Sequence, residues 1–400
     1  MSYRLVFKGV LIILNMFKTV PKAVLLVAAA HMVTDFSQGA LLVALPYFKA
    51  KFGLTYTQVS LIALTQNLAS SVIQPFFGYA TDRSPRPWLM AAGCLLSGVG
   101  MLASLLLTNY WLLVFTTALT GLGIAAFHPE GAKTVNRLSG EAKGKGVSMF
   151  VVGGNAGFAG GSLMMGGLLA SGSDAMLWLY IIPCLIIVWP LYKLAMSLPL
   201  PTGKPAQSLG SLAGIISLPL LALLGVTLVR ATVSASIGAF IPLYYVSYLN
   251  GNPVYASWLL TVFLAGGAAG TLAGGLLSDK YGSKRVMLYS ILPISLLLAL
   301  FNMSSGSIVF ALLAVASALL SAAFAGCLVL TQRMMPGNVG MASGLTLGFS
   351  VGLGSLGVLA LGRVADIWTL PMVFDILAVL PIIGFALTLF VKEGKEILNN

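Results

Sequence analysis

Two short stretches, GYATDRSPR at Gly78–Arg86 and GLLSDKYGSKR at Gly275–Arg285, decide how this chain is organised. Each follows an apolar run, and in each a glycine precedes an aspartate by the same spacing. Two further matches occur at nearly the same offset. Asp35 aligns near Arg230, and Ser148–Gly161 resembles Ser343–Leu356. Repeats in register along a chain indicate two structurally similar halves.

The composition places both halves in a membrane. Of the 400 residues, 58% are hydrophobic and only 8% are charged, and the mean hydropathy is +0.98. Soluble domains carry about 25% charged residues. At ~20 residues per span, the chain has room for about twelve helices. We therefore expect an all-α membrane protein of twelve transmembrane helices in two pseudo-symmetric six-helix bundles.

The apolar runs give the expected boundaries. Six spans are expected in each half, at 21–48, 56–80, 87–107, 111–133, 146–170, 176–197, 214–248, 254–278, 286–303, 308–332, 339–364 and 371–391. The domain organisation that follows is an N-terminal cytoplasmic or interfacial segment (1–20), a first bundle (21–197), a cytoplasmic linker (198–213), a second bundle (214–391) and a cytoplasmic tail (392–400).

The basic residues set the orientation. The formal net charge is +12, but Lys and Arg lie in short loops, so topology explains them better than nucleic-acid binding does. With the N-terminus inside, only Lys49 and Lys51 fall clearly outside, which predicts two cytoplasmic termini. The three cysteines lie within apolar runs and lack CxxC spacing, so we expect no disulfide framework, zinc site or other cofactor.

The repeated Gly–Asp stretches form a candidate gating motif on the cytoplasmic side. Its residues are Gly78, Asp82, Arg83, Gly275, Asp279, Lys284 and Arg285. Glycine lets two helices approach closely, the aspartate can accept hydrogen bonds at a neighbouring helix N-terminus, and the basic side chains anchor the inner surface. An ordinary charged cytoplasmic turn is the alternative interpretation.

Ionisable residues inside the spans are the candidate transport site, because each costs several kcal/mol unless paired or hydrated. Asp35 lies near the middle of the first expected span, and His31 and Gln38 share its helical face. Arg230 sits at the corresponding depth of the seventh span. We expect Asp35 and His31 to exchange the coupling proton and Arg230 to attract an anionic substrate. The alternative is a purely structural Asp35–Arg230 or His31–Asp35 pair.

Further polar residues interrupt other expected spans. In His128-Pro129-Glu130, Glu130 is either a proton or gating residue or a salt-bridge partner of Lys133. Candidates for the substrate cavity are Gln38, Gln66, Asn67, Asn155 and Tyr244, although bonds between helices or an aromatic belt at the membrane surface would explain the same residue types.

Several segments together resemble one known family. They are HMVTDFSQGALLVALPYF (31–48), LASSVIQPFFGYATDRSPRPW (68–88), AFHPEGAK (126–133), VVGGNAG (151–157) and QRMMPGNVGMASGL (332–345). The chain is similar here to the fosmidomycin-resistance subfamily of the major facilitator superfamily. The resemblance implies a bacterial inner-membrane drug exporter driven by proton antiport, with alternating access between two bundles. Fosmidomycin is a small phosphonate, which suits an intramembrane arginine.

The expected function is therefore proton-coupled export of a small anionic or zwitterionic compound. We expect the protein to be a monomer that interacts with its substrate, with protons and with the lipid bilayer. Export of a self-made metabolite such as a metallophore, or import of a small nutrient, remains open on the same fold. An enzyme is not expected, because His31 and His128 are the two histidines available and no complete catalytic set is present. No ATP-binding motif occurs.

Overall fold

The structure is a computed structural model that describes residues 21–140, 143–198, 217–335, 346 and 350–393, and within these ranges every regular element is a helix. The expected N-terminal segment, most of the linker and most of the C-terminal tail lie outside the described residues.

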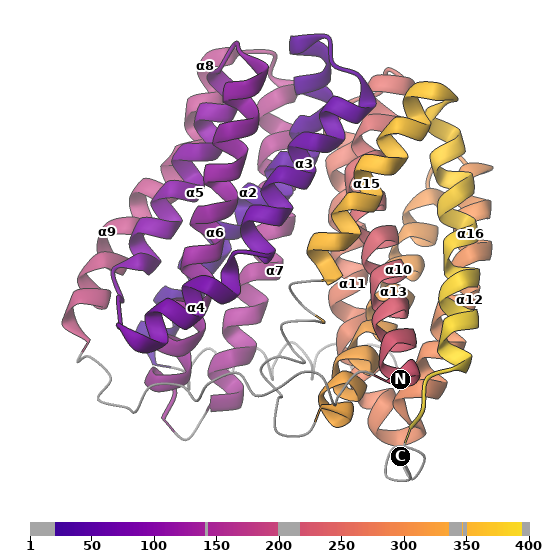
Figure 1. Cartoon of the computed structure of the whole chain (residues 1–400). Helices are drawn as coiled ribbons and strands as arrows, with labels where there is room; N and C mark the ends of the chain where they lie inside the picture. The colour runs from indigo at the N-terminus through magenta and orange to yellow at the C-terminus, as the bar shows by residue number, and fades with distance from the viewer. Residues whose placement is uncertain (1–20, 141–142, 199–216, 336–345, 347–349, 394–400) are drawn as a thin grey trace, which may run out of the picture.

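The first half of the chain forms one bundle and the second half another, side by side in Figure 1. The first contains α2 (Lys22–Phe52), α3 (Tyr56–Ser71), α4 (Gln74–Arg83), α5 (Leu89–Leu106), α6 (Tyr110–Leu138), α7 (Lys143–Ala170), α8 (Asp174–Leu177), the 3₁₀ turn η1 (Trp178–Ile181) and α9 (Ile182–Ser197). The second contains α10 (Leu218–Pro242), the π-helical η2 (Leu243–Tyr248), α11 (Pro253–Tyr281), α12 (Ser283–Asn302), α13 (Ile308–Met334), α15 (Ser350–Ile367) and α16 (Leu370–Leu389).

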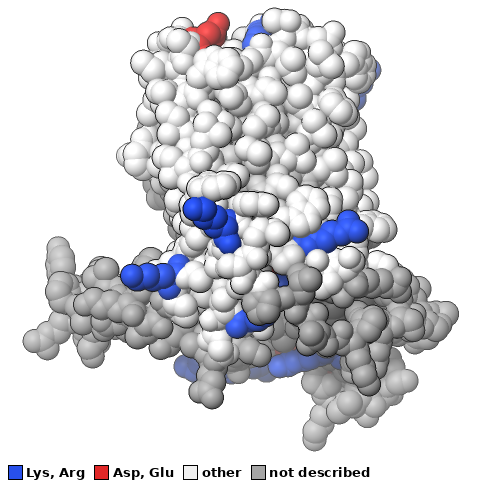
Figure 2. Space-filling view, turned by 90° about the vertical axis from the view of Figure 1, so that its left-hand side faces the viewer, with Lys and Arg blue, Asp and Glu red and all other residues white. Residues whose placement is uncertain are grey.

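The helices have the length and surface of membrane spans. In the described part of the chain, nine helical segments are long and apolar enough to cross a bilayer. Each of the twelve expected spans coincides with at least one described helix, in agreement with the expected fold. Large apolar side chains are exposed on the bundle surface, Trp111, Trp189 and Leu272 among them. Figure 2 shows the corresponding broad band of uncharged surface, with charged residues towards the two ends.

Small residues bring α2 and α7 into backbone contact. Gly153, Gly157 and Gly161 recur every four residues on one face of α7, and a methyl group on any of them would collide with the backbone of α2. The surfaces they meet, at Ala28, Met32 and Phe36, repeat with the same spacing. This packing of small residues is the contact that lipid-embedded helices favour, and it places the α7 backbone directly against the polar face of α2.

The second expected span is not one continuous helix. It is divided into α3 and α4 between Ser71 and Gln74. Pro75 explains the break, because proline lacks an amide hydrogen and its ring clashes with the carbonyl four residues earlier, at Ser71. The first copy of the gating motif, expected in a loop, instead occupies the last turns of α4. Its second copy ends α11, with only Gly282 and the residues after it beyond that helix.

The two halves meet along α3 and α15 and along α7 and α11. At the start of α3, Asp366 of α15 accepts hydrogen bonds from the backbone N–H groups of Tyr56 (2.7 Å) and Thr57 (2.8 Å) and from the Thr57 hydroxyl (2.5 Å). Thr55 caps the next free amide, that of Gln58. A carboxylate from one half therefore caps a helix of the other half.

Candidate functional site

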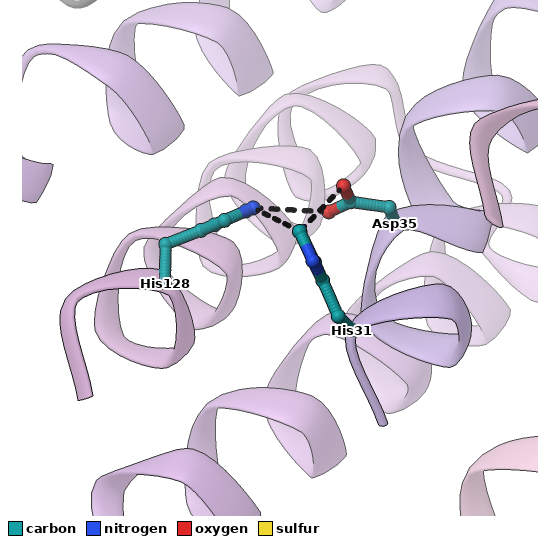
Figure 3. Close-up of side chains that lie close together, drawn as sticks. All are labelled: His31, Asp35 and His128. Atoms are coloured by element: carbon teal, nitrogen blue, oxygen red, sulfur yellow. Dashed lines mark hydrogen bonds and ion pairs between the residues drawn. The ribbon is translucent and has the colours of Figure 1, made fainter. Parts of the chain in front are cut away.

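His31, Asp35 and His128 form a compact cluster inside the first bundle (Figure 3). His31 and Asp35 lie one turn apart on α2, and His128 reaches them from α6. Nε2 of His31 is 3.1 Å from Oδ2 of Asp35, and Nε2 of His128 is 3.4 Å from Oδ1. The two Nε2 atoms are 3.0 Å apart. The side chains are largely buried, His128 being the most exposed at 18%.

The other ring nitrogen of each histidine faces a backbone carbonyl. Nδ1 of His31 lies 2.7 Å from the Phe150 carbonyl, and Nδ1 of His128 lies 2.8 Å from the Ile124 carbonyl. A carbonyl only accepts, so Nδ1 is the protonated nitrogen in both rings. In their neutral forms both Nε2 atoms then carry lone pairs. Two imidazole lone pairs and a carboxylate converge with no donor among them, so the cluster is built to bind an added cation or proton.

The surroundings hold the cluster in place. The His31 ring stacks on Phe150 with centroids 3.9 Å apart and lies near Phe127. Gly154 of α7 faces the cluster so closely that a methyl group there would lie 2.5 Å from Cε1 and 2.7 Å from Nε2 of His31. The close packing of α2 on α7 thus closes one side of the site.

Gln38 links this cluster to a cavity between the two halves. Its Nε2 donates to Oδ1 of Asp35 at 3.0 Å, and its side chain lines a cavity of about 250 Å³. The wall comes from both bundles. Its polar members are Gln38, Gln66, Asn67, Arg230 and Ser234, and its apolar members include Phe158, Leu260 and Phe263.

Arg230 supplies the cationic side chain of this cavity. Its guanidinium lies over the Phe324 ring, 4.4 Å from the centroid, and its Nε is buried without a hydrogen-bond partner. Within the described residues no carboxylate pairs with it, so the alternative of an Asp35–Arg230 pair is not realised in this conformation, whereas the His31–Asp35 pair is. A buried cation without an anion is costly, which points to an anionic group that completes the site.

The remaining polar candidates divide into two groups. Gln66 and Asn67 line the cavity, and Gln66 also donates to the Ser37 carbonyl at 3.3 Å. Asn155 is exposed on α7 and is not part of the cavity wall. Tyr244 lies instead in an aromatic cluster with Tyr248 and Phe374, their centroids 5.6 and 5.2 Å from its own. The structure therefore does not bring these two residues to the site.

Glu130 and the first gating motif meet through Lys133. The Lys133 ammonium is 3.3 Å from Oε1 of the buried Glu130, and it donates to the Thr81 hydroxyl at 2.7 Å and to the Gly78 carbonyl at 3.3 Å. The salt-bridge interpretation of Glu130 is thus realised. The side chains of Asp82 and Arg83, like that of Asp279, lie outside what the structure describes.

The second gating motif departs from the expectation of close helix contact. A Cβ atom at Gly275 would meet nothing within 4 Å, and one at Gly78 would meet Pro129 at an ordinary 3.8 Å. Gly282 is the glycine with a strict requirement, since its φ is +90°. After it, the Glu393 carboxylate accepts from the amides of Ser283 (2.6 Å) and Lys284 (3.0 Å) and so caps α12. Arg285 lines a surface hollow with Tyr281 and Tyr289.

Two residues of these contacts are not predicted from the sequence. The sequence presents His128 only within its His-Pro-Glu motif, because its partner His31 lies almost a hundred positions away along the chain. The available signal was that the chain has only two histidines, both inside expected spans. Asp366 carried a weaker signal, an acidic residue just beyond the expected span 339–364.

Two bundles of membrane helices with a cavity between them, lined by apolar residues and a few polar ones, are the architecture of a multi-pass membrane transporter. The chain belongs to the major facilitator superfamily, whose sequence pattern it matches over residues 27–222 and 222–400. It is 31% identical over 378 residues to the fosmidomycin resistance protein of Escherichia coli (strain K12), covering 92% of each chain. It is 29% identical over 394 residues to the MFS-type transporter YfnC of Bacillus subtilis (strain 168), covering 94% of each.

Solved structures agree on the fold. The crystal structure of the nucleoside transporter NupG, as its D323A mutant, matches with a TM-score of 0.78 at 15% identity, covering 92% of this chain and all of that one (100%). A bacterial homologue of the human lysosomal transporter Spinster, in an inward-facing and unoccupied conformation, matches with a TM-score of 0.63 at 14% identity, covering 92% and 94%. At such low identity these matches establish the fold alone.

Proposed function

We propose that this protein is a proton-coupled exporter of small anionic compounds in the bacterial inner membrane, with both termini in the cytoplasm. The observation that carries the proposal is the position of Gln38, which bonds Asp35 and also lines the cavity that contains Arg230. A proton site and an anion site are thereby joined through one side chain.

The proton site is the His31–Asp35–His128 cluster. Its four acceptor atoms have no donor among them while both imidazoles are neutral, so one added proton on either Nε2 supplies a donor to the other Nε2 and to the carboxylate oxygen that this nitrogen faces. Such a site binds a proton in one conformation and releases it when the α2–α6 geometry changes. Glu130, which pairs with Lys133, is a second candidate for a proton-carrying residue on the cytoplasmic side.

The anion site is centred on Arg230. A phosphonate or carboxylate in the cavity would pair with the guanidinium of Arg230, which contributes to the wall, while Gln66 and Asn67 offer hydrogen bonds and Phe158 and Phe263 provide apolar walls. The name of the E. coli relative makes fosmidomycin, a small phosphonate, the first compound to test.

The Gln38 amide couples the proton site to the substrate site, because Asp35 and the substrate cavity compete for its hydrogen bonds. With Asp35 unprotonated, the amide nitrogen of Gln38 donates to Oδ1. Once a proton on the cluster neutralises the aspartate, that bond weakens and the amide is free to reorient toward the cavity. Occupancy of the proton site thus changes the polar wall of the substrate site, which is the differential interaction that an antiporter requires.

The test is transport in proteoliposomes of defined orientation. A pH gradient that is acid on the external side should drive fosmidomycin outward, with proton counterflow seen by a pH-sensitive dye. Asp35→Asn should abolish uphill movement while the variant remains folded. Asp174→Asn, in an exposed loop helix, is the matched control. Unchanged gradient-driven transport by the Asp35 variant would refute the proton role. Transport of neutral nucleosides, but of no anion, would refute the substrate class.

A further inference from the structure

The His31–Asp35–His128 cluster brings together the ligand types of a zinc site, two imidazole nitrogens and one carboxylate. The two Nε2 atoms are 3.0 Å apart, Nε2 of His31 is 3.1 Å from Oδ2 of Asp35, and Nε2 of His128 is 3.4 Å from Oδ1. One ligand atom from each of the three residues lies within 4.8 Å of the other two. Ligands about 2.0–2.2 Å from a tetrahedral Zn²⁺ lie roughly 3.3 Å from one another. An ion therefore fits among these residues once the carboxylate of Asp35 turns to bring an oxygen toward both imidazoles.

The hydrogen bonds behind the donors are those that metal-binding histidines make. Nδ1 of His31 donates to the Phe150 carbonyl and Nδ1 of His128 to the Ile124 carbonyl, which directs the lone pair of each Nε2 into the cluster. Gln38 holds Oδ1 of Asp35 from behind. Outer contacts of this kind fix the ring orientation and raise ligand basicity. The site is thus preorganised for a cation larger than a proton.

The position of the cluster allows an ion to enter. Gly154 of α7 packs against one side of the cluster, since a Cβ atom there would lie 2.9 Å from Oδ2 of Asp35, so an ion has to enter from another side. The His128 side chain remains 18% exposed. Three protein ligands leave the fourth position of a tetrahedral ion for water. Two imidazoles with one carboxylate suit Zn²⁺ and its neighbours Co²⁺, Ni²⁺ and Cu²⁺, and not Mg²⁺ or Ca²⁺.

We propose that this cluster binds one divalent transition-metal ion per chain, with Zn²⁺ the physiological fit, and that the bound ion holds α2 and α6 together. Metal binding is independent of the transport function proposed above. Inhibition of transport by the metal is its consequence if that function holds, because the ion occupies the acceptors that the coupling proton needs.

The experiment uses the full chain purified in detergent with an affinity tag that contains no histidine. The chain has two histidines, so histidine-selective isotope labelling gives NMR signals from the cluster alone. Zn²⁺ is titrated by calorimetry and by NMR, and Co²⁺ by its visible absorption, which is intense only in tetrahedral sites. His128→Gln and Asp35→Asn remove ligands. A variant with Cys94→Ser, Cys184→Ser and Cys327→Ser removes the other soft donors, which are all buried.

We expect one Zn²⁺ per chain, shifts of both histidine signals in the unmutated protein, and an affinity loss of at least about tenfold in each ligand variant but none in the cysteine variant. Binding that survives in the ligand variants, or that disappears only with the cysteines, would overturn the proposal. Histidine signals that do not respond to Zn²⁺ would also overturn the proposal, and this measurement uses the unmutated protein, so it does not depend on the folding of any variant. If Zn²⁺ binds and proton-coupled transport is absent, the metal site stands and the proposed function fails.

Discussion

Nε2 of His31 and Nε2 of His128 face one another at 3.0 Å, and each ring donates its other nitrogen to a backbone carbonyl. Both Nε2 atoms of the neutral rings are therefore acceptors, and one added proton between them is shared by the two rings. In metal-free buffer, pH-dependent NMR of histidine-labelled protein should show both signals moving together in one step. Two separate transitions, each complete at its own pH, would contradict a shared proton.

Gln38 provides the second prediction, because among the described residues it is the one that both bonds Asp35 and lines the cavity. Gln38→Leu removes a hydrogen bond to a charged group, worth about 1.5–3 kcal/mol. We expect gradient-driven transport to fall by about 10- to 150-fold, while substrate binding at fixed pH changes less. Asn67→Ala, which alters the same cavity without a contact to Asp35, is the control. An equal loss of coupling in both variants would remove Gln38 from the coupling path.

Arg230 gives the third prediction, which concerns charge selectivity. Replacing it with alanine removes the cation that a phosphonate would meet, a charge-assisted contact worth about 1.5–3 kcal/mol. The apparent affinity for anionic compounds should drop by roughly 10- to 150-fold, and that for neutral analogues should change far less. Arg230→Lys should restore part of the loss. Competition binding with matched charged and uncharged ligands measures the affinity for each class of compound. An equal loss of affinity for the two classes would count against direct recognition of the anion by Arg230.

The glycines of α7 allow a matched test of helix packing. Gly157 faces the α2 backbone at Met32, whereas nothing lies within 4 Å of a Cβ placed at Gly167. Gly157→Ala should therefore lower the thermal stability measured in detergent, with a cost of about 1–3 kcal/mol from overpacking. Gly167→Ala should leave stability unchanged or raise it by up to about 1 kcal/mol through helix propensity. Equal effects would show that α2 and α7 are less tightly packed than described.

Asp366 supplies the fifth prediction. Asp366→Ala uncaps two amides at the start of α3, a loss of about 0.5–2 kcal/mol, and weakens the contact between the halves at that end. A cysteine introduced at the buried Ser60, which faces Gly362, should then react faster with a membrane-impermeant thiol reagent. Asp375→Ala, whose carboxylate bonds Asn302 within the second half, is the control. No change in labelling would exclude Asp366 from the closure of this end.

The sequence was sufficient for the architecture because apolar run length and the Gly78/Gly275 repeat are properties of the chain itself. It placed His31, Asp35 and Gln38 on one face of α2 because helical periodicity fixes that relation. It could not join His128 to them, nor Asp366 to Tyr56, because those contacts depend on how distant helices cross. The apolar run 56–80 predicts one continuous span, whereas Pro75 ends the regular helix there and α4 begins separately.

The cap that Asp366 places on α3 also bears on the energetics of the resting protein. Because the carboxylate and the helix that it caps belong to different halves, the bond exists only while that end is shut, and parting the halves there exposes a charge and two bare amides to be rehydrated. With the predicted topology, the shut end faces the cell exterior. On the export function proposed above, the empty protein then favours the state open to the cytosol, where cargo binds, and opening toward the exterior requires the energy of proton and cargo binding.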